Sequence, residues 1–204
     1  MEKSGGRMNR GFFPEQTHFI GVLLPDDLTQ QLLKCREYMN HKYGCRSGFG
    51  TPIHVTLVPP FQLPAPCTTA DISAALAQMV AEKKLHPFNA EIEGFDAFGD
   101  RTLFAKVLPS AVWTAFRAAV YSAVAQASPG AVRKDTRPFQ PHITVANRDI
   151  PPGASTEALE YLNELELKTT FPVDNITIFE RKDKRWIRSQ HIIKMEEENE
   201  NHNF

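Results

Sequence analysis

Apolar and polar residues are distributed along this chain in patterns that predict short strands alternating with helices. In the first half, apolar runs with β-like spacing predict three strands, and apolar residues that recur every three or four positions predict two helices. The strands are expected at His18–Leu24, Ile53–Val58 and Phe88–Phe98, and the helices at Leu28–Tyr43 and Asp71–Ala81. A proline followed by two aspartates, at residues 25–27, favours the start of the first helix.

The second half of the chain repeats this order of elements. Strands are expected at Thr102–Leu108, Pro141–Val145 and Phe171–Phe179, and helices at Ala111–Ala127 and Thr156–Leu167. A last strand, Arg185–Lys194, is expected to pair as a hairpin across Lys182–Lys184.

Equivalent positions in the two halves are separated by similar numbers of residues. His54 and His142 lie 88 positions apart, and the leading strands, at Ile20 and Leu103, lie 83 positions apart. This regularity predicts a duplicated α+β unit that forms two lobes related by a pseudo-two-fold axis. Because no linker separates the halves, we expect the lobes to share one cleft.

Each half carries a His-x-Thr tripeptide within an apolar strand, as His54/Thr56 and as His142/Thr144. Side chains alternate faces along a strand, so the histidine and the threonine of each motif share one face. The apolar face should pack beneath helices, whereas the polar face needs water or a cleft. A two-fold axis therefore gathers two imidazoles and two hydroxyls around one point.

This set of side chains suits chemistry at a phosphodiester. One neutral histidine can accept a proton from the attacking water or hydroxyl, and the other, protonated, can deliver a proton to the leaving oxygen. The ordinary histidine pKa of about 6.5 allows both forms near neutral pH. The threonine hydroxyls can donate hydrogen bonds to the non-bridging oxygens. We expect no metal and no cofactor, and the residues leave open which histidine is the base.

Composition restricts the classes of partner. The 204 residues are 42% hydrophobic, enough for a core, and carry a formal net charge of −1. A general basic coat for long duplexes is absent, so any contact with nucleic acid is expected to be local. The three cysteines form no CxxC pair, and their odd number argues against a disulfide framework. We therefore expect reduced thiols and a cytoplasmic location.

The ends of the chain are more polar than its middle. We expect residues 1–16 to be a flexible lead-in, residues 17–195 a single bilobal domain and residues 196–204 a disordered tail. No apolar run approaches the roughly 20 residues that span a bilayer, so no membrane partner is expected. Since the repeat completes the cleft within one chain, we expect a monomer.

The two motifs in their context resemble the paired signatures of the two-histidine (2H) phosphoesterase superfamily, in particular bacterial 2′-5′ RNA ligase-like proteins and RNA 2′,3′-cyclic phosphodiesterases. The matching segments are IHVTLVPPF at residues 53–61 and RPFQPHITVANR at residues 137–148. The resemblance implies two lobes around a central cleft, each an antiparallel sheet with helices on its outer face. It also implies metal-independent opening of 2′,3′-cyclic phosphates to 2′-phosphates and, in some members, reversible 2′-5′ RNA joining.

By motif position, the resemblance implies catalytic roles for His54, Thr56, His142 and Thr144. It favours His142 as the general base and His54 as the general acid.

Four further residues are candidates for contact with substrate. Arg148 matches a basic residue that follows the second motif, with a longer spacing from the threonine than in many members. Phe61 and Phe139 match aromatic neighbours of the motifs and could either stack on a base or belong to the core. Arg137 could bind phosphate or pair with Asp135.

The remaining charged features have structural interpretations. The basic run at residues 181–185 is expected to be a solvated hairpin turn, and a phosphate-steering rim is the alternative. The glycine-rich loop at residues 44–50 lacks the GxxxxGK[ST] pattern, so binding of a triphosphate by a P-loop is not supported. The other histidines are expected in the structural interior or at the surface: His18, His41, His86, His191 and His202.

The leading hypothesis is a phosphodiesterase that acts on RNA ends or small nucleotides bearing a 2′,3′-cyclic phosphate. A neighbouring hypothesis is a phosphodiesterase for 2′-5′ oligonucleotides or for cyclic ADP-ribose phosphate, which shares the site. A third is a noncatalytic RNA- or nucleotide-binding module. A metal protein that uses His54 and His142 as ligands is disfavoured, because neither motif has a nearby carboxylate or cysteine ligand.

Overall fold

The computed structural model describes residues 15–133 and 137–196, and the chain there forms eight strands and four helices. In chain order these are β1 (His18–Leu23), α1 (Asp26–Tyr43), β2 (His54–Phe61), α2 (Thr69–Lys83), β3 (Phe88–Phe98), β4 (Thr102–Val107), α3 (Ala111–Ala127), β5 (His142–Asn147), α4 (Ala154–Asn163), β6 (Lys168–Val173), β7 (Asn175–Lys182) and β8 (Arg185–Lys194). Most of the expected lead-in, most of the expected tail, and Asp135 lie outside the described residues.

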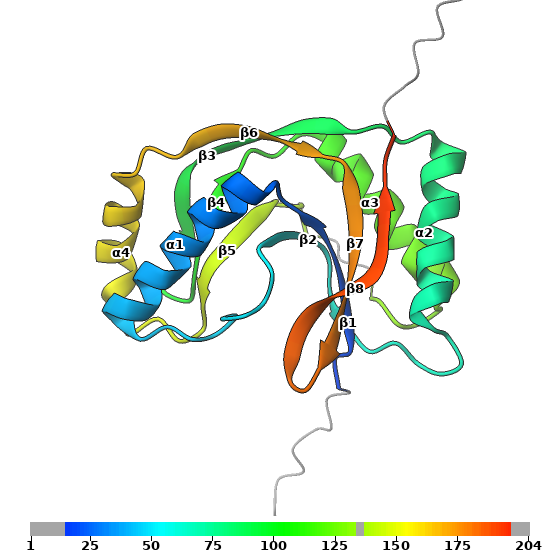
Figure 1. Ribbon diagram of the computed structural model, residues 1–204, viewed down its shortest axis with the longest axis horizontal. Helices are drawn as coiled ribbons and strands as arrows, with labels where there is room; N and C mark the ends of the chain where they lie inside the picture. The colour runs from blue at the N-terminus through cyan, green and yellow to red at the C-terminus, as the bar shows by residue number, and fades with distance from the viewer. Residues whose placement is uncertain (1–14, 134–136, 197–204) are drawn as a thin grey trace, which may run out of the picture.

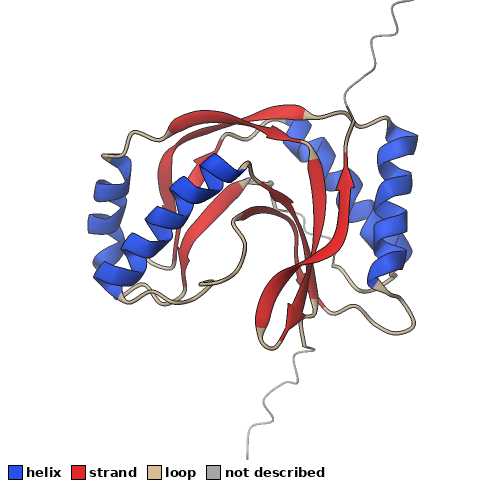
Figure 2. Ribbon diagram, in the orientation of Figure 1, coloured by secondary structure: helices blue, strands red, loops and turns tan. Residues whose placement is uncertain are grey.

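The strands form two four-stranded antiparallel sheets, with the orders β2-β1-β7-β8 and β5-β4-β3-β6. Helices α2 and α3 pack together against the first sheet, and α1 and α4 pack against the second. Figures 1 and 2 show these helix pairs at opposite sides of the molecule, on the outer faces of the sheets. The predicted α+β fold with two pseudo-symmetric lobes is therefore confirmed.

The lobes are interwoven and do not correspond to consecutive halves of the chain, as a simple repeat would give. Strand β3 follows α2 in the sequence but joins the second sheet, and β7 and β8 return to the first. The helices cross as well: α1 follows β1 of the first sheet but contacts β5 of the second, whereas α3 follows β4 but contacts β2. Each lobe thus receives a helix from the other, so neither lobe is complete without it.

The single strand predicted at Phe171–Phe179 is wrong, because the chain there forms β6 in one sheet and β7 in the other. The change of sheet occurs at Asp174, beside the buried Asn175. The Asn175 side chain accepts a hydrogen bond from the Leu23 N–H and donates one to the Leu23 carbonyl, both at 2.9 Å. These two bonds satisfy the backbone groups of Leu23, which lies beyond the last paired residues of β1 and β7. They also fix where β7 starts.

Strand β2 is longer than predicted, because it continues through Pro59 and Pro60 to Phe61. Proline cannot donate a ladder hydrogen bond, but β2 is an edge strand, where that loss is tolerated. Helix α2 begins earlier than predicted because Thr68 and Asp71 form a capping box. The Thr68 hydroxyl accepts from the Asp71 N–H, and the Asp71 carboxylate accepts from the Thr68 N–H.

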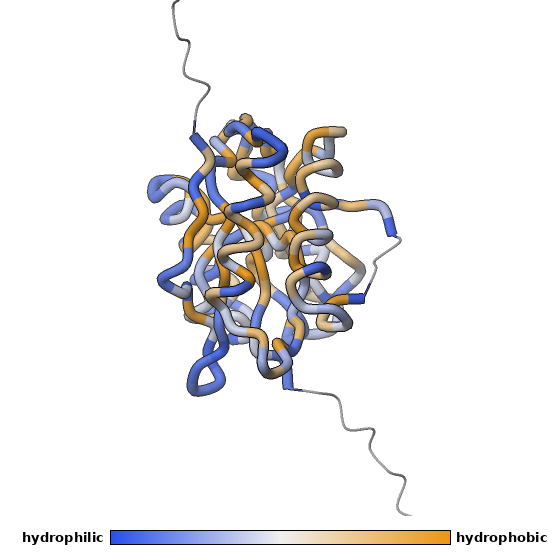
Figure 3. The backbone as a smooth tube through the Cα atoms, turned by 90° about the vertical axis from the view of Figure 1, so that its right-hand side faces the viewer, coloured by the Kyte–Doolittle hydropathy of each residue, from blue (hydrophilic) through white to orange (hydrophobic). Residues whose placement is uncertain are grey.

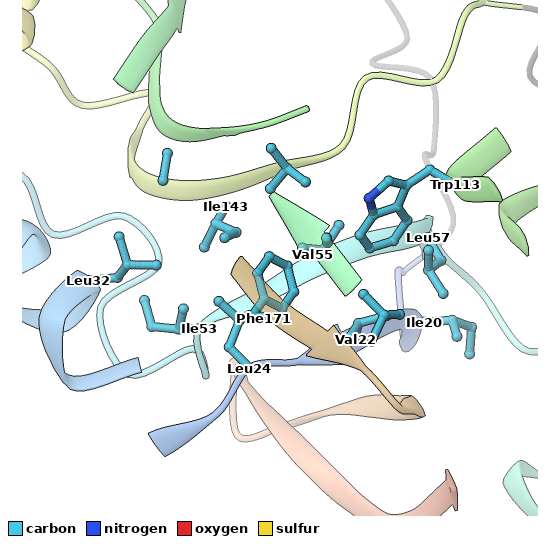
Figure 4. Packing of buried hydrophobic residues seen from close by; sticks show 14 of the residues in the cluster. Ile20, Val22, Leu24, Leu32, Ile53, Val55, Leu57, Trp113, Ile143 and Phe171 are labelled. Atoms are coloured by element: carbon cyan, nitrogen blue, oxygen red, sulfur yellow. The ribbon is translucent and has the colours of Figure 1, made fainter. Parts of the chain in front are cut away.

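The apolar face of each motif strand lies in the hydrophobic core. Val55 and Leu57 of β2 and Ile143 and Val145 of β5 are at most 2% exposed. Figure 4 shows three of these side chains among buried residues from other strands and helices, including Trp113 of α3. Figure 3 shows the same division at the level of the chain, with hydrophobic segments inside and hydrophilic segments at outer loops. Burial of this kind contributes about 1.5–3 kcal/mol for each aliphatic side chain.

Within the described ranges, none of the helices has the length and apolar character needed to cross a membrane. The three cysteines, Cys35, Cys45 and Cys67, are free thiols, and the first two are buried. Burial raises the pKa of the Cys35 thiol to about 11, so this thiol stays protonated at neutral pH.

We expect Asn175→Ala to lower the free energy of unfolding by about 2–3 kcal/mol, because each lost hydrogen bond contributes about 1 kcal/mol. The substitution removes the two bonds to Leu23 and the bond that Asn175 accepts from Thr177. The bond that Asn175 donates to the Asp174 carboxylate is also lost, but water can replace it because that carboxylate is exposed. Urea unfolding followed by circular dichroism should show a lower midpoint with an unchanged slope. Asn89→Ala, on the exposed face of β3, is the matched control. An Asn175→Ala midpoint equal to that of the control would contradict this account.

Candidate active site

The two motif strands occupy the same place in their sheets. Strand β2 is the edge strand of the first sheet, β5 is the edge strand of the second, and the two strands contact each other. Figure 1 shows them near the centre of the molecule, between the two helix pairs. The edges of the two sheets therefore meet where the His-x-Thr tripeptides lie.

The register of the two motif strands is equivalent. In the first sheet, Thr56 pairs with Gly21. In the second sheet, Thr144 pairs with Phe104. His54, Thr56, His142 and Thr144 are all half-buried, whereas the residues between them are buried. The predicted division of each motif into an apolar and a polar face is present in both strands.

A backbone carbonyl two residues earlier fixes the ring of each histidine. Nδ1 of His54 lies 2.7 Å from the Pro52 carbonyl oxygen, and Nδ1 of His142 lies 2.8 Å from the Gln140 carbonyl oxygen. A carbonyl can only accept, so Nδ1 carries the proton in both rings. In the neutral form Nε2 is then the free basic nitrogen, on the side of the ring away from the backbone.

Aromatic rings pack against both imidazoles. The centroid of the His54 ring lies 4.6 Å from that of Phe19 and 5.2 Å from that of Phe179. The centroid of the His142 ring lies 5.1 Å from those of Phe98 and Phe104. These rings restrict how each imidazole can turn, and they shield it from water.

Gly21 marks where the two halves of the site differ. A Cβ atom at this position would lie 2.7 Å from the Val55 carbonyl oxygen and 3.4 Å from Cδ2 of His54. The equivalent position in the second sheet, opposite Thr144, carries the large side chain of Phe104. Glycine is therefore needed in the first sheet, because a Cβ atom would clash with the Val55 carbonyl oxygen.

Burial lowers the pKa of both histidines below the ordinary value of 6.5. The pKa of His54 falls to about 4, first because of burial and then because of the positive charges of Arg36 and His142, against the hydrogen bond to Pro52. The pKa of His142 is also lowered by burial, against its hydrogen bond to Gln140. Both imidazoles are therefore mainly neutral at pH 7 in the free protein.

A pocket of about 380 Å³ lies against both motif strands, with Thr56 of β2 and His142 of β5 in its wall. Arg137 and Phe139, two of the predicted substrate contacts, also line it. His54 and Thr144 do not line this pocket directly, but the charge of His142 reaches the His54 ring. The structure thus brings residues from both distant motifs to one place.

Arg117 is a pocket residue that the sequence analysis missed. It lies on α3, its Nε–H donates to the Leu57 carbonyl at 3.2 Å, and its guanidinium lies 5.0 Å from the ring centroid of Phe139. A cation is placed beside the motif strand by a helix that comes from the other half of the chain. No local pattern signals this, because the contact spans 60 positions.

The structure does not bring two predicted contacts to the pocket. Arg148 is exposed, has a positive φ of 73° and follows β5 at the end away from His142. At about 3.3 Å per residue, six positions separate it from that histidine by roughly 20 Å. Phe61 is 5% exposed, and its ring centroid lies 6.0 Å from that of His18 in the interior. We therefore leave both residues out of the proposed site.

The structure also locates the other charged features. The ring nitrogens of His18 lie 2.8 Å from the Thr17 hydroxyl and 3.0 Å from the Thr69 hydroxyl, so this histidine joins β1 to α2. The basic turn at residues 181–185 is exposed at the tip of the β7–β8 hairpin. Among the described residues, no group of three or more His, Cys, Asp or Glu side chains is arranged to hold a metal ion.

The sequence matches the profile of the 2′-5′ RNA ligase superfamily over residues 24–185. No curated protein shows a significant match to it. Among solved structures, TT0787 of Thermus thermophilus is 20% identical, with a TM-score of 0.62, and the match covers 89% of this chain and 99% of that chain. Escherichia coli LigT complexed with 3′-AMP is 16% identical, with a TM-score of 0.57, and the match covers 86% and 95%. These likenesses establish the two-lobed fold.

We expect the stability of the protein to fall as the pH drops from 6.5 to about 4, with His54 contributing to the slope. In this window the unfolded chain binds a proton at this position and the folded chain does not, so lower pH favours unfolding. The free energy of unfolding, measured by urea titration at several pH values, should decline less steeply for His54→Asn. His41→Asn, exposed on α1, is the control. Equal slopes for His54→Asn and the wild type would contradict the expected burial effect.

Proposed function

Since the chain belongs to the 2′-5′ RNA ligase superfamily, we propose that its paired His-x-Thr strands form the active site of a phosphodiesterase. The proposed reaction is the opening of 2′,3′-cyclic phosphates on RNA ends or small nucleotides. The observation that carries this proposal is the equivalence of the two imidazoles. Each is held through Nδ1 by a carbonyl two residues earlier, on edge strands that contact each other.

The proposed reaction uses two proton transfers at one phosphorus atom. Nε2 of one neutral imidazole takes a proton from water as its oxygen attacks phosphorus, and the other imidazolium gives its proton to the leaving ribose oxygen. A P–O bond to water forms and the ring P–O bond breaks, leaving a phosphomonoester. With the 3′-oxygen as leaving group the product is the 2′-phosphate. The hydroxyls of Thr56 and Thr144 donate to the non-bridging oxygens, where negative charge is held.

The low pKa values of the free histidines fit a site that acts on an anion. Burial keeps both rings neutral until a negatively charged phosphate is bound, and that charge favours protonation of one of them. Binding of the substrate thereby creates the general acid. The resemblance favours His54 in that role, although the charge of Arg36 opposes its protonation; the kinetic test below distinguishes the two assignments.

The pocket supports a small nucleotide or a short RNA end as the substrate. Its wall offers the aromatic rings of Phe98 and Phe139 and the guanidinium of Arg137 beside Thr56 and His142. Aromatic rings can stack on a base, and arginine can bind phosphate. The formal net charge of −1 does not favour long-range attraction of extended RNA. The related fold of LigT was solved with 3′-AMP, a ligand of this size class.

Joining of 2′-5′ linkages is a second candidate activity, because the family that the sequence matches is described by that reaction. Attack by an RNA 5′-hydroxyl in place of water, with the roles of the two histidines unchanged, converts a cyclic phosphate into a 2′-5′ diester. A substrate panel that includes an RNA 5′-hydroxyl acceptor separates hydrolysis from joining.

We expect the wild-type protein to hydrolyse an oligoribonucleotide with a 2′,3′-cyclic phosphate end in the presence of EDTA. His54→Ala and His142→Ala should each lower kcat by about 10²- to 10⁴-fold, the usual contribution of a general acid or base. Product identity is read by chromatography against 2′- and 3′-phosphate standards. His41→Ala is the control for loss of an exposed histidine. Turnover that survives both motif substitutions, or that needs an added metal, would overturn the proposal.

We expect the pH dependence of kcat/KM to be a bell with its maximum below pH 6.5. This profile reports the pKa values of the free enzyme, and burial lowers both. Lower pKa values move both limbs of the bell towards acid pH. The residual activity of His54→Ala and of His142→Ala, measured across pH, shows which histidine is the general base. The variant that lacks the base loses the limb on which the rate rises with pH. A maximum above pH 7 would contradict the burial of the two rings.

A further inference from the structure

Arg36 is a buried cation that the proposed reaction does not use. It lies on α1, is 7% exposed and extends from the helix towards the backbone of both motif regions. Its Nη1 donates to the carbonyls of Gly48 at 3.1 Å and Thr51 at 2.5 Å, and its Nη2 donates to the Thr144 carbonyl at 3.3 Å. Arginine is seldom buried to this extent without a partner of opposite charge.

In the described part of the chain, each hydrogen-bond partner of Arg36 is a backbone carbonyl. Among the described residues, no carboxylate lies within ion-pair distance of it. Burial lowers its pKa to about 10, so the group is still positively charged at neutral pH. A buried charge that is not neutralised by an acid is costly to the folded state. Packing alone does not explain why a buried charge is present at this position. The location of the three carbonyls suggests a reason.

These carbonyls belong to the two halves of the proposed site. Thr51 immediately precedes Pro52, whose own carbonyl accepts the Nδ1–H of His54. Thr144 is the threonine of the second motif. One planar guanidinium therefore connects the segment that precedes His54 to the strand that carries His142. Its contact with Thr144 spans 108 positions of the sequence.

Helix α1 gives Arg36 a fixed base. Leu32, one turn earlier on the same helix, is fully buried and belongs to the same core cluster as Ile53 and Ile143, which neighbour the two histidines in sequence (Figure 4). The other crossing helix makes a related contact, because Arg117 of α3 donates to the Leu57 carbonyl of β2. Each crossing helix thus sends an arginine to the backbone of the motif strand that it covers.

We propose that Arg36 is a positioning residue that sets the two His-x-Thr segments relative to each other and places positive charge behind the proposed phosphate site. This inference rests on the proposed function for its effect on turnover, but not for its effect on the histidines. The charged groups that act on His54 are Arg36 and His142, so loss of the guanidinium changes the surroundings of the first imidazole directly. A fork with two donating nitrogens can connect two carbonyls in fixed geometry, whereas an ammonium acts as a single point.

The test compares Arg36→Met and Arg36→Lys with two controls. Lys34→Met makes the same charge change at an exposed position of α1. Asn163→Ala removes two hydrogen bonds between α4 and the Phe95 backbone of β3, so it is expected to destabilise the fold without removing a partner of Arg36. We expect Arg36→Met to lower kcat about 10- to 100-fold, the scale of a misplaced catalytic group, with little change in KM. Arg36→Lys should recover part of the loss. The pKa of His54, followed by NMR of its ring protons, should rise in Arg36→Met and stay near the wild-type value in Arg36→Lys.

The outcomes separate positioning from general stability. If kcat and the His54 titration in Arg36→Met match those of Lys34→Met, the inference is wrong. If Asn163→Ala reproduces both effects, Arg36 contributes only stability. If Arg36→Met fails to fold, Arg36→Lys decides the question. A wild-type kcat in Arg36→Lys would overturn the proposal. A reduced kcat in Arg36→Lys, with an unchanged His54 titration, would support it. If the wild type does not act on cyclic phosphates, the proposed function fails, and the NMR titration still tests the effect of Arg36 on His54.

Discussion

Two short hydrogen bonds, from imidazole Nδ1 to a carbonyl two residues earlier, determine which chemistry is open to the proposed site. They fix the tautomer of His54 and of His142, and they leave Nε2 as the basic nitrogen in both rings. Without them, each ring could turn or exchange tautomers, and neither nitrogen would be committed to proton transfer. The aromatic rings around each imidazole reinforce this constraint, because they limit rotation and exclude water.

The interwoven topology explains how two local arrangements become one site. Both motif strands are edge strands, and each is covered by a helix that originates in the other half of the chain. Asn175 fixes the point where the chain passes from one sheet to the other, and Arg36 connects the backbones of the two motif regions. The relative position of the two histidines is therefore a property of the whole fold and not of either lobe.

Much of this arrangement could be predicted from the sequence, and most of the remainder had no local signal. The alternation around His54 and His142 predicted which residues of each motif are buried, because period two on a strand admits only two faces. The division between β6 and β7 was missed, since β-like spacing continues through Asp174 while the strands change sheet. Arg36 was missed because its partners are backbone carbonyls, which any residue supplies. Gly21 was open to prediction, since glycine inside an apolar strand marks a close approach.

The claim that both imidazoles act on one phosphate can be tested by NMR. A nucleoside 2′-monophosphate is added to the protein while the ring signals of His54 and His142 are followed across pH. The account predicts that both signals respond with the same dissociation constant and that the ligand raises the pKa of at least one of the two rings. Responses with different dissociation constants, or a response from only one ring, would show that the two histidines belong to separate environments.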